Sequence, residues 1–155
     1  MQSEVDVADA GRRAAPRAAL TDDLSFLLAR ANALSLAAGN AALAEHDLKV
    51  RSYSVLALAA GDSRPSQREL AEFLRLDPSQ VVALVDDLQV KGLLIREVDP
   101  ADRRANVVTA TSRGRAVFAQ AQASARHAEE ELHRSLSPGD RRRLTELLRS
   151  IAFPD

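Results

Sequence analysis

The sequence predicts a mainly α-helical fold of the α+β class with one two-stranded β-hairpin. Apolar residues recur at helical spacing along most of the chain, and several of these stretches begin at a capping residue or a proline. Two short runs with strand-like character flank a loop rich in Asp and Arg. The composition is 46% hydrophobic but only 3% aromatic. The core must therefore be built from Leu, Ala and Val, which favours closely packed helices.

The N-terminal part of the chain predicts a tail followed by two helices. Residues 1–19 are polar and rich in Ala, so we expect a flexible tail. A long helix is expected over residues 21–46, with Thr21 as its N-cap. Its apolar stripe is too long for a small domain to cover, so it needs the C-terminal end of this chain or of a second chain as a partner. A helix over residues 50–60 should bring Tyr53 into the core.

A capping box predicts the start of the third helix. The Ser66 hydroxyl can accept a hydrogen bond from the Glu69 amide, while the Glu69 carboxylate can accept one from the Ser66 amide. Leu70, Phe73 and Leu74 then recur at helical spacing. We expect these three side chains to be buried on one face.

The fourth helix is predicted to start at Asp77 as the N-cap, with Pro78 in the first helical position. Lys91 and Gly92 supply a cationic last turn and a left-handed stop. The apolar stripe expected to face the core consists of Val81, Leu84, Val85 and Leu88. Two such helices joined by a tight turn are typical of a helix-turn-helix.

The exposed side of this fourth helix begins with small or amide-bearing residues that could enter a major groove. Gln80 could read adenine, Ser79 could contact a base edge or a phosphate, and Val82 could contact a thymine methyl group. Ala83 lies on the same side. The alternative is that all four are ordinary surface residues of a helical hairpin.

Residues 93–98 and 106–111 have strand-like character, and Pro100 with its charged neighbours cannot continue either strand. The segment therefore predicts a β-hairpin with a cationic loop. A hairpin directly after a helix-turn-helix is typical of a winged helix-turn-helix, which binds double-stranded DNA.

Arg103 and Arg104 lie at the tip of this predicted wing. We expect salt bridges to Asp99 and Asp102 to orient the two guanidinium groups, whose planar shape suits the narrow and strongly negative minor groove. A solvated charged loop is the alternative. The cationic side chains expected to project from this part of the chain are Arg68, Arg75, Lys91, Arg103 and Arg104.

The C-terminal part predicts a helix over residues 113–134 and a last helix capped by Ser137. The last helix carries an apolar face with nothing local to cover it, made of Leu144, Leu147, Leu148 and Ile151. We therefore predict a two-fold dimer formed by the first and last helices. Such a dimer places two groove-reading helices about one duplex turn apart, roughly 34 Å.

The predicted organisation has three parts. Residues 1–19 form the tail, residues 20–48 and 112–155 form a helical dimerisation region, and residues 49–111 form the winged helix-turn-helix lobe. The fold class is thus a mainly α winged helix-turn-helix with a two-stranded β-wing and long N- and C-terminal dimerisation helices.

One motif resembles a known family. The run Asp99-Pro100-Ala101-Asp102-Arg103-Arg104, followed by Val107, Thr111 and Gly114, is similar to the signature D-P-x-D-R-R-x-x-V-x-L-T-x-x-G of the multiple-antibiotic-resistance regulator (MarR) family. Similar stretches occur at residues 53–56, 69–71, 76–79 and 84–88, and the resemblance covers residues 20–153. It implies a dimeric, mostly helical winged-helix repressor, often released from its operator by a small aromatic or phenolic ligand. The predicted two-fold dimer would read a pseudo-palindromic operator in double-stranded DNA.

This sequence departs from the family pattern at four positions. Val82 and Ala83 replace a polar residue and an Arg that many members carry, and Asp87 replaces a frequent basic residue. Ala110 stands where a leucine commonly precedes the signature threonine. Base reading and phosphate contacts in this chain are therefore expected to be unusual.

The candidate site residues form two sets. Those expected to contact DNA are Ser66, Gln67, Arg68, Pro78, Ser79, Gln80, Val82, Ala83, Arg103 and Arg104. The resemblance suggests a ligand cleft between the dimer helices and the winged lobe, and the candidates for it are Leu28, Arg30, Asn32, Leu34, Tyr53 and Phe118. Tyr53 also fits a core position and Arg30 a plain surface position.

The net charge of −1 gives no general attraction to nucleic acid, so the case for DNA rests on where the cations project. The absence of cysteine excludes thiol-based sensing and cysteine metal sites. His127 and Glu131 stand at a spacing that can share a metal, but no third ligand is placed by the sequence, so no metal site is predicted.

No phosphate-binding loop, nucleophile elbow or other catalytic motif is present, so we expect no enzyme and no cofactor. No signal peptide or long uncharged apolar run is evident, which predicts a cytoplasmic protein without a membrane span. The competing interpretation is a winged-helix scaffold for protein interactions that has lost sequence-specific DNA binding.

Overall fold

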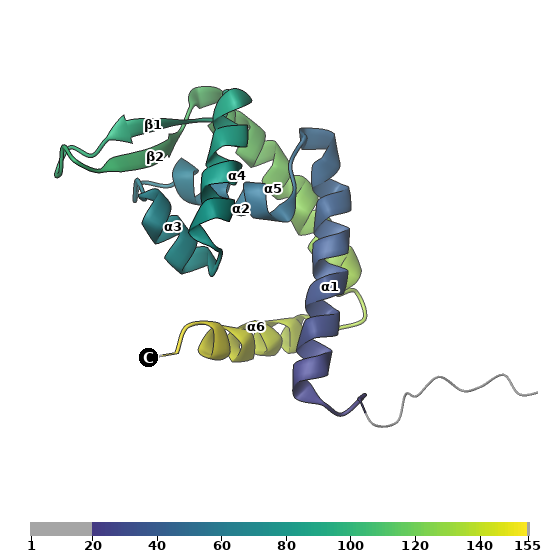
Figure 1. The fold of residues 1–155 in the computed structure, drawn as a ribbon. Coiled ribbons are helices and arrows are strands. Elements are labelled where there is room, and N and C mark those ends of the chain that lie inside the picture. Colours follow the sequence, from purple (N-terminus) through teal and green to yellow (C-terminus); the bar gives the residue numbers. More distant parts are fainter. Residues whose placement is uncertain (1–19, 155) are drawn as a thin grey trace, which may run out of the picture. The chain divides into compact units, whose positions relative to one another are not determined.

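The computed structural model describes residues 20–154, so the predicted tail at residues 1–19 lies outside the described residues. Figure 1 shows the order of the elements along the chain. They are α1 (Leu24–Leu43), a 3-10 turn (Ala44–His46), α2 (Val50–Ala60), α3 (Gln67–Leu74), α4 (Pro78–Val90), β1 (Leu94–Val98), β2 (Asn106–Ala110), α5 (Ser112–Leu132) and α6 (Pro138–Ala152). The predicted mainly helical class with one hairpin is confirmed.

Helix α1 belongs to two units, because the boundary between them falls after Leu34. The predicted N-cap, Thr21, is wrong. Asp23 takes that role, since its carboxylate accepts a hydrogen bond from the Phe26 amide at 2.7 Å. Asp serves as an N-cap at least as well as Thr does, and Thr21 lies in the turn that precedes the helix.

The segment Leu24–His46 is the one apolar stretch in residues 20–154 that is long enough to cross a membrane by length and composition alone, with a mean hydropathy of 1.2 over the best window. The sequence predicts no long uncharged apolar run, and this stretch contains Arg30 and Glu45. One such helix is weak evidence for a membrane protein, since a helix that packs in a soluble protein can have the same composition.

The core of the second unit lies where α2, α4 and the β-hairpin meet. The predicted inner stripe of α4 is confirmed, because Val81, Val85 and Leu88 are fully buried and Leu84 is half-buried. They pack with other buried side chains from α2, α3 and the hairpin, namely Val55, Leu56, Leu70, Leu94 and Val108. No aromatic residue is fully buried within residues 20–154, in agreement with the composition.

Helix α3 buries the predicted face except for Phe73. Leu70 and Ala71 are buried, whereas Phe73 is 56% exposed. The Phe73 ring instead packs against the ring of Phe153, just beyond α6, with centroids 5.7 Å apart. Leu74, the third predicted residue, is half-buried against the core, and the small Ala71 takes the buried position beside Leu70.

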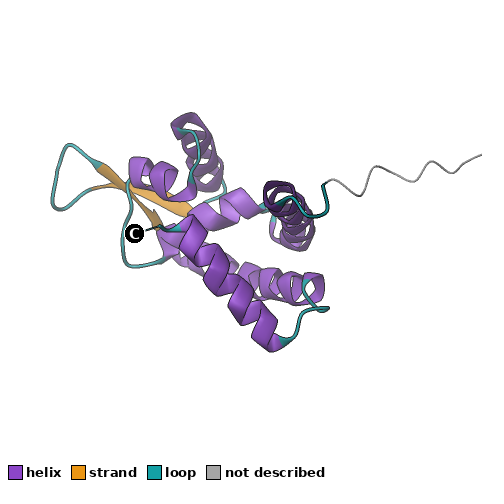
Figure 2. Ribbon diagram, turned by 90° about the horizontal axis from the view of Figure 1, so that it is seen from below, coloured by secondary structure: helices purple, strands orange, loops and turns teal. Residues whose placement is uncertain are grey.

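The two strands form an antiparallel hairpin in the register Leu94↔Ala110 to Val98↔Asn106. The hairpin is fixed to the start of α3, because the Val108 amide donates to the Pro65 carbonyl at 2.8 Å. Figures 1 and 2 both show the loop between the strands extending away from the helices. The hairpin is the predicted wing, and this loop is its tip.

Helix α6 begins at Pro138, and the Ser137 hydroxyl accepts from the Asp140 amide at 3.1 Å, as predicted. No residue of α6 within the described chain is buried. Its predicted apolar face is exposed and consists of Leu144, Leu147, Leu148 and Ile151. The face is thus uncovered by the described part of this chain.

Candidate nucleic-acid interface

The start of α3 is held by the predicted capping box. The Ser66 amide donates to the Glu69 carboxylate at 2.7 Å, and the Glu69 amide donates to the Ser66 hydroxyl at 3.2 Å. The hydrogen bond from the Ser66 backbone, followed by the one from its hydroxyl, lowers the pKa of Glu69. Arg68 is exposed, and its guanidinium pairs with the Glu72 carboxylate at 2.8 Å.

The start of α4 is capped as predicted, and the cap changes what Ser79 can offer. The Asp77 carboxylate accepts from the Ser79 amide at 2.8 Å and also from the Ser79 hydroxyl. These bonds, the hydroxyl one first, lower the pKa of Asp77. Because the Ser79 hydroxyl already donates its proton, it is left with acceptor capacity, which suits a base amino group better than a phosphate.

The other predicted groove-facing residues of α4 lie on its exposed surface. Pro78, Gln80, Val82 and Ala83 are all exposed. The Gln80 side-chain amide makes no hydrogen bond within the described chain, so it keeps a free donor and a free acceptor. That pair of groups is what bidentate contact with adenine requires.

The wing tip differs from the prediction in one respect. Arg103 and Arg104 are exposed as expected, but their predicted salt bridges to Asp99 and Asp102 are wrong. The two carboxylates instead close their own turns, because Asp99 accepts from the Ala101 amide at 2.8 Å and Asp102 from the Arg104 amide at 3.0 Å. Short Asp side chains often bond the backbone two residues ahead. Both guanidinium groups are thus free of ion pairs within residues 20–154.

Sequence reasoning missed Arg96, which joins three elements. Its guanidinium on β1 donates to Gln67 at the start of α3 and to Gln89 near the end of α4, both at 2.7 Å, and it also pairs with Asp86. The Gln67 carbonyl oxygen is therefore occupied, and its amide NH2 remains available. An arginine inside a strand beside a helix with exposed acids is the only sequence signal that could have indicated this contact.

Lys91 does not project as a free cation, which corrects the sequence prediction. Its ammonium group lies 2.9 Å from the Asp87 carboxylate and 3.1 Å from the Asp47 carboxylate. It also donates to the Asp47 backbone carbonyl at 2.9 Å. Partial burial by itself lowers the pKa of Lys91, but the hydrogen bonds to Asp87 and Asp47 outweigh it and the pKa is raised.

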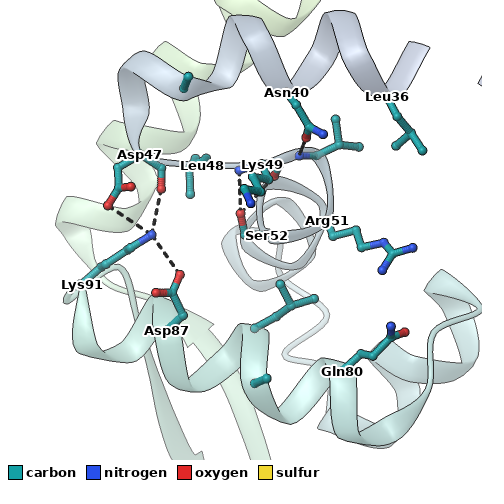
Figure 3. Close-up of a pocket in the computed structure, with 14 residues that line it drawn as sticks. Leu36, Asn40, Asp47, Leu48, Lys49, Arg51, Ser52, Gln80, Asp87 and Lys91 are labelled. Carbon is teal, nitrogen blue, oxygen red and sulfur yellow. Dashed lines mark hydrogen bonds and ion pairs between the residues drawn. The ribbon is translucent and has the colours of Figure 1, made fainter. Parts of the chain in front are cut away.

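These charges border a cleft of about 880 Å³ between the α1–α2 corner and α4 (Figure 3). One wall is α4, which contributes Gln80 and Ala83. The facing residues include Asn40, Lys49 and Arg51. The cleft therefore opens directly beside two residues of the predicted DNA-reading set.

The candidate ligand residues fall in two groups. Tyr53 and Phe118 lie side by side with ring centroids 5.6 Å apart, and both are half-buried against the core. Burial is the main cause that raises the pKa of the Tyr53 hydroxyl. The other candidates belong to the first unit or its edge, where all four are exposed, namely Leu28, Arg30, Asn32 and Leu34.

The three histidines are not brought together as a metal site. No group of three or more His, Cys, Asp or Glu residues that could hold a metal ion occurs within residues 20–154. His46 hydrogen-bonds to the Ser124 hydroxyl at 2.9 Å, while His127 and Glu131 are exposed on α5.

Part of the chain is similar to known transcriptional regulators. A model described as MarR family matches residues 46–105. A curated protein from Thauera aromatica, a putative transcriptional regulatory protein for the hcr operon, is 29% identical over 103 residues. That match covers 66% of this chain and 62% of the Thauera protein, so the chain spans less than two thirds of this relative.

Solved structures match over most of the chain. A MarR family transcriptional regulator from Rhodococcus sp. RHA1 is 40% identical with a TM-score of 0.84, covering 89% of this chain and 98% of that one. CouR from Rhodococcus jostii RHA1 bound to p-coumaroyl-CoA is 41% identical with a TM-score of 0.79, covering 89% and 97%. The transcriptional repressor CouR bound to a 23-mer DNA duplex is 29% identical with a TM-score of 0.83, covering 91% and 100%.

Proposed function

Because the chain belongs to the MarR family of transcriptional regulators, we propose that it binds a pseudo-palindromic operator in double-stranded DNA as a homodimer and represses transcription. A small-molecule effector would then release it from the operator. Residues 49–111 would bind DNA, and residues 20–48 and 112–155 would form the dimer.

The observation that carries this proposal is the exposed start of α4 together with the free arginines of the wing. Gln80 presents an unoccupied amide on a helix that is narrow enough for a major groove. Arg103 and Arg104 are exposed at the tip of a hairpin in the same unit, where they could reach the adjacent minor groove. We therefore call α4 the recognition helix.

The remaining predicted DNA contacts are of two kinds in this proposal, phosphate contacts and contacts with base edges. Arg68 and the half-buried Ser66 and Gln67 lie at the start of α3, where they would contact phosphates and fix the protein on the duplex. Pro78, Val82 and Ala83 would pack against base edges and exclude water. Val82 can contact only an apolar group, so thymine methyl groups are expected opposite it.

The uncovered apolar face of α6 supports the proposed dimer. Ile151 is 60% exposed and Leu147 is 46% exposed, on a helix with no buried residue among those described. A soluble protein rarely leaves such a contiguous apolar face in water. A two-fold axis would pair it with the same face of a second copy and would place two recognition helices on successive turns of the duplex.

For the effector we propose a small aromatic or phenolic compound. The relative that is 41% identical was solved with p-coumaroyl-CoA, so this aromatic thioester is the first compound to test. Tyr53 and Phe118 form an aromatic pair in the second unit that could contact a ring. Leu28, Arg30, Asn32 and Leu34 remain proposed contacts. An effector needs only to favour a conformation that does not bind DNA.

The function is tested by selecting binding sites from random duplexes and then measuring gel shifts at moderate salt. A repressor selects one pseudo-palindrome, shifts it tightly, and releases it when the effector is added. A protein-interaction scaffold shifts all duplexes equally and weakly, and that result would reject the proposal. A regulator that binds an operator would act in the cytoplasm. Fluorescence of a tagged chain in cells can check this location.

A further inference from the structure

We propose that Lys91, together with Asp47 and Asp87, positions the recognition helix for operator binding, an inference that rests on the proposed function. The ammonium group of Lys91 donates to the Asp87 carboxylate, the Asp47 carboxylate and the Asp47 carbonyl, all within 3.1 Å. An ammonium group has three N–H donors, so this cluster uses all of them. We call it the Lys91 clasp. Figure 3 shows it joining the recognition helix to the segment between α1 and α2.

The clasp holds the helix against a corner that is itself fixed. Asp47 adopts a left-handed conformation with φ of 53°, and the next amide, that of Leu48, donates to the Leu43 carbonyl at 3.2 Å. The Val50 amide donates to the Asn40 side chain at 2.8 Å. Leu43 and Leu48 are both buried. The corner is thus anchored on both sides of Asp47.

Apolar packing alone restricts the orientation of the recognition helix less than packing combined with the clasp. The buried residues Val81, Val85 and Leu88 hold the helix against the core, but hydrophobic burial has no preferred direction. Directional bonds act at one end of the helix on two sides. Arg96 on β1 bonds Gln89 and Asp86. Lys91 makes two bonds to Asp47 of the corner, while its bond to Asp87, within the helix, holds the ammonium group in place. Gln80 lies at the other end, roughly 16 Å away at 1.5 Å per residue. A tilt of a few degrees at the clasp would therefore displace Gln80 by about 1 Å, more than bidentate base contact tolerates.

The clasp also accounts for two carboxylates in a lobe that faces phosphates. Acidic side chains near DNA weaken binding by simple electrostatics. Asp47 and Asp87 are largely exposed, with side chains 85% and 51% accessible, so each ion pair adds little to the stability of the fold. A role in orientation, rather than in stability, explains why the charges are placed here.

Electrostatics and positioning predict opposite signs for Asp47→Asn. Removing a negative charge should tighten binding to any duplex if charge alone matters, whereas loosening the clasp should weaken binding to the operator. Asn tolerates positive φ, so the backbone at this position is not strained. We expect operator Kd to rise about threefold, with affinity for unrelated duplex unchanged or higher.

Asp62→Asn is the matched control. Asp62 is an exposed acid in the loop before α3 and forms no ion pair within the described residues. The substitution Asp62→Asn removes the same charge from the same lobe and leaves the clasp unchanged. We expect equal or slightly tighter binding to operator and unrelated duplex alike.

The second pair of variants tests the cation. Lys91→Met should raise operator Kd about tenfold, and Lys91→Arg should recover most of the affinity because it restores the charge and the donors. Thermal melting and far-ultraviolet circular dichroism of every variant establish that the folded protein is being compared.

The outcomes separate this inference from the proposed function. Weaker operator binding by Asp47→Asn with recovery in Lys91→Arg supports the clasp. Operator binding by Asp47→Asn that equals or exceeds that of the unchanged chain overturns the clasp and leaves the proposed function standing. If the unchanged chain prefers no sequence, the proposed function fails and the positioning role fails with it.

Discussion

At the scale of single residues, the wing arginines matter because nothing in the described chain pairs with them. The Asp99 and Asp102 carboxylates bond backbone amides, so Arg103 and Arg104 would lose no protein partner on binding DNA. Removing water from an unpaired guanidinium costs free energy, and the new contact with phosphate offsets that cost directly. Arginines already held in salt bridges would first have to break them.

The first prediction concerns Arg104→Ala and Arg103→Ala. Each should weaken operator binding because a cation proposed to contact the duplex is lost, and each should reduce the salt dependence of log K by about 1. Neither side chain is buried, so the melting temperature should not change. Fluorescence anisotropy at several salt concentrations measures both quantities. Unchanged affinity in both variants would remove the wing from the mechanism.

The second prediction concerns base reading by Gln80. Gln80→Ala removes a donor and an acceptor from the exposed start of α4, so preference at one base pair in each half-site should relax by about 1–3 kcal/mol. Binding-site selection with the variant measures this preference. An unchanged consensus would show that Gln80 reads no base.

At the scale of elements, the caps of α3 and α4 make the stability of the winged lobe depend on pH. The pKa of Glu69 is lowered from its ordinary 4.5, and that of Asp77 from 3.8, by hydrogen bonds at the helix starts. A carboxyl whose folded pKa is lowered contributes stability above its unfolded pKa and loses it as pH falls through the folded value. The caps of α3 and α4 should therefore weaken as pH drops below these ordinary values.

The third prediction isolates this effect with Glu69→Gln. Gln can complete a capping box but does not titrate in this range. The variant should be somewhat less stable than the unchanged chain at pH 7, and the difference should shrink as pH falls below 4.5, the ordinary pKa of Glu69. Urea unfolding at a series of pH values measures it. Parallel curves for the two proteins would mean that the Glu69 charge does not stabilise the fold.

The fourth prediction concerns the contact between α5 and the start of the hairpin. A Cβ atom at Gly114 would lie 1.8 Å from the Leu93 carbonyl oxygen, which is backbone and cannot rotate away. Gly114→Ala should therefore destabilise the fold by about 3 kcal/mol. Gly139→Ala is the control, because its nearest neighbour would be the Ser137 hydroxyl at 3.8 Å. Urea unfolding should place the control near the unchanged chain, and equal stability of both variants would contradict the close contact.

The elements that begin at local signals were predictable, and the contacts between elements were not. Ser66, Asp77 and Ser137 cap helices because each acts within three residues of itself, so the sequence carries the whole signal. Arg96 bonds residues 29 and 10 positions away, and Lys91 bonds one 44 positions away. Such pairs depend on how helices pack, which the spacing of charges along a chain does not encode.

At the scale of the whole molecule, the proposed dimer must satisfy two requirements at once. It has to cover the apolar face of α6, and it has to hold two recognition helices one duplex turn apart. The sequence predicted the dimer from the apolar stripes of the first and last helices, because a stripe without a local cover needs a partner. The spacing of the two recognition helices was predicted from the two-fold symmetry of that dimer. Sequence patterns leave the pairing geometry open, since they do not state which residues of two copies meet.

The last prediction tests this arrangement with Leu147→Glu combined with Ile151→Glu. Both side chains are exposed on α6, so the isolated fold should tolerate the change, while a seam that buries two new carboxylates should separate. Mass measured by light scattering should fall to that of one chain. Operator affinity should drop to that of a single half-site, because linkage of two weak sites is lost. Ser150→Glu, on the same helix but off the apolar stripe, adds a charge and should leave the dimer intact. A doubly substituted chain that stays dimeric would place the seam elsewhere, and the spacing of the two recognition helices would then need another support.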